Sequence, residues 1–312
     1  MIPISPLNTK SLAFIQARID NKTKPLGALG ALELLALQLA LITTQRVQKK
    51  SDFTLSEDNS SGQIKIRNPA MIVFAGDHGI NENSVSIAPS AVTKQMVLNF
   101  LKGGAAINCL CQSNDIALTV VDCGILQAIS QDEVPQIRNN ARKPVNFVEH
   151  RLGAGTNDFS AKPAMSITQV EQGFGYARQL INAQISQGVE ILLLGEMGIA
   201  NTSSAAALMS ALTSLSVKDC VGRGTGITDE QLDKKINLIE RALKRVSVSE
   251  QHVENLTQES IMLLLSELGG FEIVQMVSAI LSAAAANIPI VIDGFIVSVA
   301  ALVALRLDNN VA

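Results

Sequence analysis

The sequence predicts an α/β protein with a parallel sheet flanked by helices and a small helical part at the N-terminus. Short, wholly apolar runs alternate with longer stretches of helical periodicity along most of the chain. Strands without polar alternation are buried on both faces, which is typical of parallel sheets covered by helices. The chain has 312 residues, 47% hydrophobic and 17% charged, so it can bury a large core.

Residues 1–45 are expected to form the helical part of a small domain, and residues 69–312 the α/β core domain with a site crevice. A Pro/Gly break at 23–30 should separate two N-terminal helices. Residues 47–68 are mostly polar and are expected to form a surface loop. The helical spacing rests on two sets of apolar residues, Leu12, Ile15 and Ile19, then Leu32, Leu35 and Leu39.

Four buried strands are predicted in the core domain, at 71–75, 116–121, 189–194 and 288–292. Residues 127–165 lack periodicity and should form an irregular excursion. Two helices should open with capping boxes, one at 168–171 and one at 228–231. Helices are expected at 92–101, 168–185, 232–243, 256–268, 271–286 and 296–307.

Acidic side chains follow all four predicted strands: Asp77 with His78, Asp122, Glu196 and Asp293. The carboxyl ends of parallel strands meet at one edge of a sheet, where open α/β folds bind ligands. Each acid taken singly could instead cap a helix, and His78 alone could be a structural hydrogen-bonding residue. Four acids at the same structural position favour a site, and burial would suit one of them to general base work.

Two glycine turns could bind phosphate. The turn around Gly198 follows the strand at 189–194 and precedes a helix, where backbone N–H groups favour an anion. The second turn, around Gly224, also precedes a helix, and Lys235 on that helix could reach back to a phosphate. An ordinary strand-to-helix connection and a solvated lysine are the alternatives. A dinucleotide fingerprint does not fit the spacing, and a Walker sequence is absent, so an oxidoreductase is not favoured.

Composition narrows the class of protein. The net charge of −3 and the absence of Trp argue against nucleic-acid binding. The four cysteines fit no zinc or disulfide spacing, and no metal site is expected. The apolar run at 288–307 is interrupted by Pro289, Asp293 and Arg306, so we interpret it as core rather than a membrane span. With no signal peptide evident, a cytoplasmic protein is expected.

Several long motifs together resemble one family. It is the nicotinate-nucleotide–dimethylbenzimidazole phosphoribosyltransferases of cobalamin lower-ligand assembly, and the likeness follows nearly the whole chain in order. The motifs are TKPLGALG at 23–30, FAGDHGI at 74–80, VTKQMVLNFLKGGAAIN at 92–108, LLLGEMGIANTSSAAAL at 192–208, GRGTGI at 222–227, LGGFEI at 268–273 and IDGFI at 292–296.

The resemblance implies an α/β homodimer that needs no metal or organic cofactor. It implies transfer of phosphoribose from nicotinate mononucleotide to 5,6-dimethylbenzimidazole, giving α-ribazole 5′-phosphate and nicotinate with inversion at the anomeric carbon. A carboxylate should take the benzimidazole proton. By position, Glu196, Met197 and Gly198 match the family's substrate-contacting turn, Gly224 and Lys235 its phosphate contacts, and Ser86 and Gln95 its benzimidazole pocket; Asp77, His78 and Asp293 are further expected binding residues.

One part of the family pattern has no counterpart here. The resemblance places the family's catalytic Glu in an Arg-Leu-Gly-Glu-Gly motif, and no such motif precedes Ala312. We therefore expect Glu196 to act as a substitute base, with weak turnover by residues 1–312. The alternative is a non-catalytic nucleotide-binding protein on the same scaffold.

Overall fold

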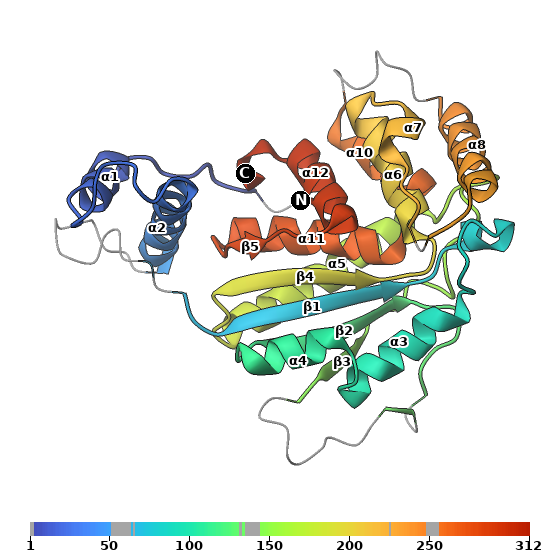
Figure 1. The fold of residues 1–312 in the computed structure, drawn as a ribbon, viewed down its shortest axis with the longest axis horizontal. Coiled ribbons are helices and arrows are strands. Elements are labelled where there is room, and N and C mark those ends of the chain that lie inside the picture. The colour runs from blue at the N-terminus through green and yellow to red at the C-terminus, as the bar shows by residue number, and fades with distance from the viewer. Residues whose placement is uncertain are drawn as a thin grey trace.

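The computed structural model describes residues 3–50, 64, 66–130, 133–134, 144–224, 226–247 and 256–312. It confirms the predicted α/β architecture, with five parallel strands in the order β3-β2-β1-β4-β5 (Figure 1). The strands are β1 (Pro69–Gly76), β2 (Ala117–Gly124), β3 (Asn146–Glu149), β4 (Ile191–Met197) and β5 (Ile290–Val291).

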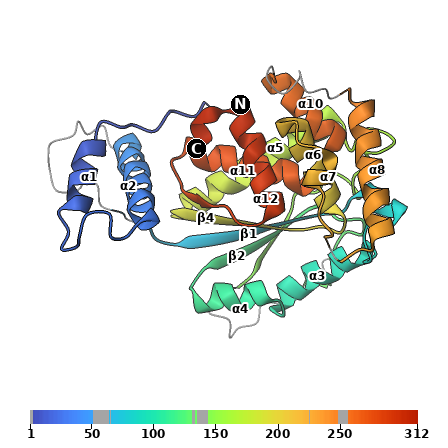
Figure 2. The ribbon, with the colours of Figure 1, turned by 45° about the horizontal axis from the view of Figure 1, so that its top comes forward.

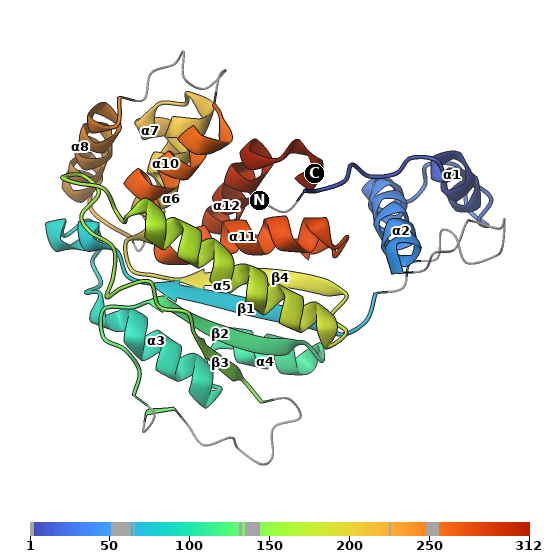
Figure 3. The same cartoon turned by 180° about the vertical axis from the view of Figure 1, so that it is seen from behind.

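Helices cover both faces of the sheet, as Figures 1 and 3 show from opposite sides. One face carries α3 (Ala91–Lys102) and α4 (Ala106–Ser113). The other carries α5 (Ile167–Ser186), α6 (Asn201–Thr213), α10 (Gln258–Leu268), α11 (Phe271–Ala285) and α12 (Phe295–Leu307). The smaller pieces are the 3-10 turn η1 (Gly79–Asn83), α7 (Val217–Cys220), α8 (Asp229–Arg245), which packs on α6, and η3 (Asn309–Val311).

Alternate residues of the central strands pack into the core on opposite faces of the sheet. In β1, Ile72 and Phe74 point to the large helical layer, whereas Val73 and Ala75 point to α3 and α4. All four are essentially inaccessible to solvent. Burial on both faces accounts for the continuous apolar runs from which the parallel sheet was predicted.

The two N-terminal helices, α1 (Leu12–Asp20) and α2 (Ala31–Lys50), pair with each other to one side of the core (Figure 2). The Pro/Gly break between them is a series of tight turns, and Gly27 and Gly30 have positive φ angles of 72° and 53°. Arg46 at the far end of α2 joins the pair to the core through Glu190, with 3.1 Å between Nη2 and Oε1.

Several expectations need correction. Strand β3 and helix α4 were not predicted, because β3 is short and half-exposed and α4 has only two turns. Strand β4 continues through Gly195 to Met197, so the expected turn begins only at Gly198. The first capping box is made by Ser166 and Gln169, two residues before the predicted one, whereas the Thr228–Gln231 box is confirmed. Most of the expected surface loop, 51–63 and 65, lies outside the described residues.

The topology fixes where a ligand can bind. From β1 the chain moves outward through β2 to β3, then returns through α5 to place β4 on the other side of β1. The strand order therefore reverses between β1 and β4. A crevice opens beyond the carboxyl ends of the strands at such a point, and ligands of doubly wound folds bind there.

Candidate functional site

Glu196 lies at this reversal point. It sits beside Phe74 in the β1–β4 ladder, so its side chain shares the face covered by α11. The Asn201 side-chain amide donates a hydrogen bond to its Oε2. Burial, and then the neighbouring Glu272 carboxylate, raise the pKa of Glu196 to about 7, against the opposing effects of Asn201 and His78. A carboxyl group with this pKa can accept a proton at neutral pH.

Lys235 is the second charged group of the site. It belongs to α8, yet only 2% of its surface is exposed. Its Nζ donates to the Thr202 hydroxyl at 2.8 Å and lies 3.4 Å from the Gly222 carbonyl oxygen. Within the described residues no carboxylate forms an ion pair with it. Burial lowers its pKa to about 8, so a buried ammonium lacks a counter-charge and would gain from an anionic ligand.

The first turn of α6 connects these two groups. Asn201 holds the carboxylate of Glu196, and the next residue, Thr202, holds the ammonium of Lys235. The residue before the helix, Ala200, is buried at φ 71°, a left-handed conformation that costs a non-glycine residue about 1 kcal/mol. Strain of this kind concentrates at functional sites. Two consecutive residues of one helix N-terminus thus bind a carboxyl group of raised pKa and a buried cation.

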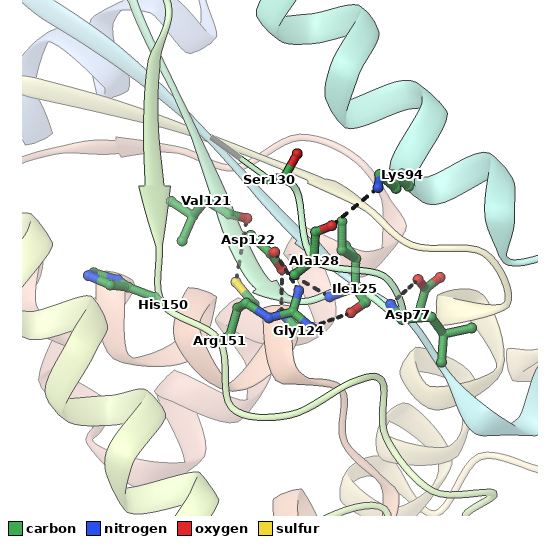
Figure 4. A network of polar contacts seen from close by, with 12 residues as sticks. Asp77, Lys94, Val121, Asp122, Gly124, Ile125, Ala128, Ser130, His150 and Arg151 are labelled. Atoms are coloured by element: carbon green, nitrogen blue, oxygen red, sulfur yellow. Dashed lines mark hydrogen bonds and ion pairs between the residues drawn. The ribbon is translucent and has the colours of Figure 1, made fainter. Parts of the chain in front are cut away.

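The other strand-end acids differ in their surroundings, and Figure 4 shows those of Asp77 and Asp122. Asp122 accepts N–H groups of Gly124 and Ile125, both at 2.9 Å, and pairs with Arg151 at 2.5 Å. It therefore fixes the turn after β2 and has no free oxygen to offer a ligand. Asp293 is exposed beyond β5, a strand that pairs only with Leu192 and Leu193 at the start of β4. Of the predicted strand-end acids, Asp122 is thus bound by the protein itself, and Asp293 is exposed to solvent.

Asp77 does lie at the reversal point. Its Oδ2 accepts the Leu126 N–H at 2.8 Å, and burial raises its pKa. The next residue, His78, is fully buried and forms a hydrogen bond of 2.6 Å with Glu272 at the start of α11. His78 thus forms the kind of buried hydrogen bond that the structural alternative expected. Glu272 itself was missed, because it lies at the start of a helix rather than after a strand.

The remaining expected residues surround this centre. Met197 points to the opposite face and packs with the α3 layer. Gly198 has no room for a side chain, since a Cβ there would overlap the Gly76 carbonyl oxygen. Gly224, at φ 51°, lies close to Thr202 and Lys235: a Cβ there would be 3.8 Å from the lysine Nζ. The turn around Gly224 and the lysine thus meet as predicted, although Thr225 is outside the described residues.

The two expected benzimidazole residues lie on the segment after η1. Ser86 is half-buried and accepts the Ala88 N–H at 3.2 Å. Gln95 is exposed on α3. The segment approaches α8, where the Gln231 amide is 3.5 Å from the Ser84 carbonyl oxygen. A separate apolar cavity of about 520 Å³ lies between α2, β5 and α12, and none of the residues above lines it.

Comparison of the whole chain with known proteins identifies its family. The family model described as phosphoribosyltransferase matches residues 4–312. A relative from Vibrio campbellii, named nicotinate-nucleotide–dimethylbenzimidazole phosphoribosyltransferase, is 51% identical over 296 residues, which are 95% of this chain and 78% of the relative. This chain belongs to that phosphoribosyltransferase family. The resemblance drawn from the sequence motifs is thereby confirmed.

Further proteins of the phosphoribosyltransferase family are similar to this chain over nearly its whole length. The Pseudoalteromonas translucida relative of the same name is 45% identical over 309 residues, 99% of this chain and 80% of its own. The crystal structure of CobT from Thermus thermophilus superposes with a TM-score of 0.81 at 32% identity, covering 97% of this chain and 80% of that one. Among the helices described here, none has the length and apolarity needed to cross a membrane.

Proposed function

We propose that this protein transfers phosphoribose from nicotinate mononucleotide to 5,6-dimethylbenzimidazole, giving α-ribazole 5′-phosphate and nicotinate. The names of its relatives support this reaction. The observation that carries it is the first turn of α6, where Asn201 binds a carboxyl group with a pKa of about 7 and Thr202 binds a buried ammonium that has no carboxylate partner among the described residues. The reaction needs one group to accept a proton and another to bind a phosphate, and these two suit those tasks.

The chemistry is an exchange of bases at one carbon. The unprotonated ring nitrogen of dimethylbenzimidazole forms a bond to the anomeric carbon as the bond to nicotinate breaks, and nicotinate leaves with the electron pair of that bond. The proton on the other benzimidazole nitrogen passes to the carboxylate of Glu196. Attack from the face opposite nicotinate converts the β configuration into α.

The direct test is to incubate the protein with both substrates and to measure α-ribazole phosphate and nicotinate by chromatography. Equal amounts of the two products are expected. Calorimetry with nicotinate mononucleotide should be run on the same preparation. Binding of the nucleotide without either product would favour the alternative, a nucleotide-binding protein without turnover.

Lys235→Ala is expected to weaken binding of nicotinate mononucleotide by about ten- to a hundredfold, because a charge-assisted contact contributes about 1.5–3 kcal/mol. The pKa of about 8 adds a pH signature: the ammonium binds phosphate only when protonated, so affinity should fall as the pH rises above about 8. Calorimetry across this range measures both effects. The exposed neighbour Lys234 provides the control, since Lys234→Ala should bind normally. An unchanged dissociation constant for Lys235→Ala would contradict the assignment.

Ser86 and Gln95 are proposed to orient the aromatic base, since a few polar groups fix orientation in an otherwise apolar pocket. Replacing both with Ala is expected to raise the KM for dimethylbenzimidazole about tenfold while leaving that for the nucleotide near its parent value, because one or two hydrogen bonds of about 1 kcal/mol each are lost. Steady-state kinetics with each substrate varied in turn would measure this. Equal changes in both constants would remove these residues from the benzimidazole pocket.

A homodimeric, cytoplasmic enzyme is proposed as the working form. Exposed leucines on α2, among them Leu32, Leu34 and Leu35, provide apolar surface suited to an interface. Buried, unpaired thiols at Cys111, Cys123 and Cys220 suit a reducing compartment. Sedimentation equilibrium would test the dimer, and fractionation of cells would test the location.

A further inference from the structure

A buried pair of a histidine and a glutamate acts on the ionisation of Glu196. His78, just after β1, and Glu272, in the first turn of α11, both have fully buried side chains, with 2.6 Å between Nε2 and Oε1. Two glycines make room for the pair. A Cβ at Gly270 would overlap the imidazole ring, and one at Gly76 would lie 2.7 Å from Glu272 Oε2. The backbone is thus shaped around these two side chains.

The same backbone contacts connect the pair to Glu196. Gly76, against which Glu272 packs, has its carbonyl oxygen against Gly198. The side-chain amide of Asn201, which binds Glu196, lies 3.4 Å from the same Cβ position of Gly198. Glu196 also lies on the sheet face that α11 covers, so the pair at the start of α11 and the carboxylate that is proposed to take the proton lie on the same face.

The pair is incompletely hydrogen-bonded. Within the described part of the chain, neither Glu272 Oε2 nor His78 Nδ1 has a hydrogen-bond partner. The other titratable groups that act on the pair are Asp77 from the end of β1, Glu196 from β4 and the Cys123 thiol from β2. Burial opposes the charged imidazole, but the carboxylates of Glu272, Asp77 and Glu196 outweigh it and raise the pKa of His78. The buried His78 ring thus lies among three carboxyl groups that favour its protonated form.

We propose that His78 and Glu272 are a positioning pair that sets the ionisation of Glu196, and thereby the pH range in which Glu196 can accept a proton. The Glu272 carboxylate repels a negative charge on Glu196, and the His78 imidazolium attracts one. The pair is proposed to act on the reaction only through its effect on Glu196. This inference rests on the proposed function, in which Glu196 is the base.

Glu272→Gln removes the repelling charge while keeping the size of the side chain. The ionisation midpoint of Glu196 should then fall by about one pH unit, since a like charge nearby shifts a carboxyl group by one unit or more. The midpoint is measured by ¹³C NMR of labelled glutamate carboxyls, with the Glu196 signal identified by its loss in Glu196→Gln. The acid limb of the rate profile should move by the same amount. The matched control is Glu190→Gln, at the opposite end of β4, which should leave both unchanged.

The outcomes separate this inference from the proposed reaction. A lower Glu196 midpoint in Glu272→Gln supports the pair, even if the parent protein forms no α-ribazole phosphate, in which case the reaction alone is wrong. An unchanged midpoint overturns the pair. Should Glu272→Gln fail to fold, ¹⁵N NMR of His78 in the parent protein decides. An imidazolium that persists above pH 6.5 supports the pair, and a neutral ring at that pH overturns it.

Discussion

Glu196→Gln is expected to lower the rate of α-ribazole phosphate formation by about 10²–10⁴-fold, because this is the usual contribution of a general base. Nicotinate mononucleotide should still bind, since the substitution leaves Lys235 and its phosphate contacts in place. In the parent protein kcat/KM for the nucleotide should rise with pH up to about 7, because the base works only when ionised, and fall again above about 8 as Lys235 loses its proton. Rates from pH 5.5 to 9 measure both effects.

The stability of Glu196→Gln separates lost chemistry from lost structure. A carboxyl group whose pKa is raised from 4.5 to about 7 on folding opposes folding, progressively more as the pH rises from 4.5 to 7. The Gln variant should therefore be at least as stable as the parent protein at pH 8. If this stable variant retained full activity, the base would lie elsewhere, with Asp77 and Asp293 the next candidates.

Gly198→Ala is expected to have the largest effect on folding. The added methyl group would overlap the Gly76 carbonyl oxygen, which belongs to the backbone at the end of β1, and the backbone also fixes the position of the methyl carbon. Neither can turn away as a side chain could, so a loss of about 2–4 kcal/mol in the free energy of unfolding is expected. Activity should fall as well, because the Asn201 N–H donates to the Gly198 carbonyl oxygen and the Asn201 side chain binds Glu196. Denaturant unfolding and the product assay measure the two effects.

Gly175→Ala is the matched control. Gly175 lies within α5 with open space around its missing side chain. Alanine favours a helix over glycine by about 0.5–1 kcal/mol, so this variant should be slightly more stable and fully active. If Gly198→Ala were as stable as Gly175→Ala, the close approach of β1 and β4 at Gly76 would not constrain the site.

Most of the fold was predictable because strands that are buried on both faces consist of consecutive apolar residues, which are easy to recognise in a sequence. Strands β1, β2 and β4 were predicted on this basis, and α8 was predicted from its periodicity and its capping box. Strand β3 was not, since its residues are only half-buried at the edge of the sheet and carry no such run. Helix α4 lacks the length needed to show periodicity.

The site was predictable where it follows strands. Glu196 and Asp77 were placed at the reversal point by the rule that parallel strands end along one edge. The same rule also placed Asp122 at this edge, but there Arg151 and the turn after β2 bind its carboxylate, and Asp293 is exposed beyond the short strand β5. The contribution of Glu272 could not be foreseen, because only tertiary packing brings the start of α11 against β1.

The central position of β1 also affects how the chain is synthesised. Its first neighbour, β2, leaves the ribosome soon after it, but its second neighbour, β4, follows only after residues 125–190 have been added. Until then one edge of β1 presents unpaired N–H and C=O groups, the pattern that invites pairing with other chains. The strand that borders the crevice in the finished protein is therefore an open edge for a long part of translation.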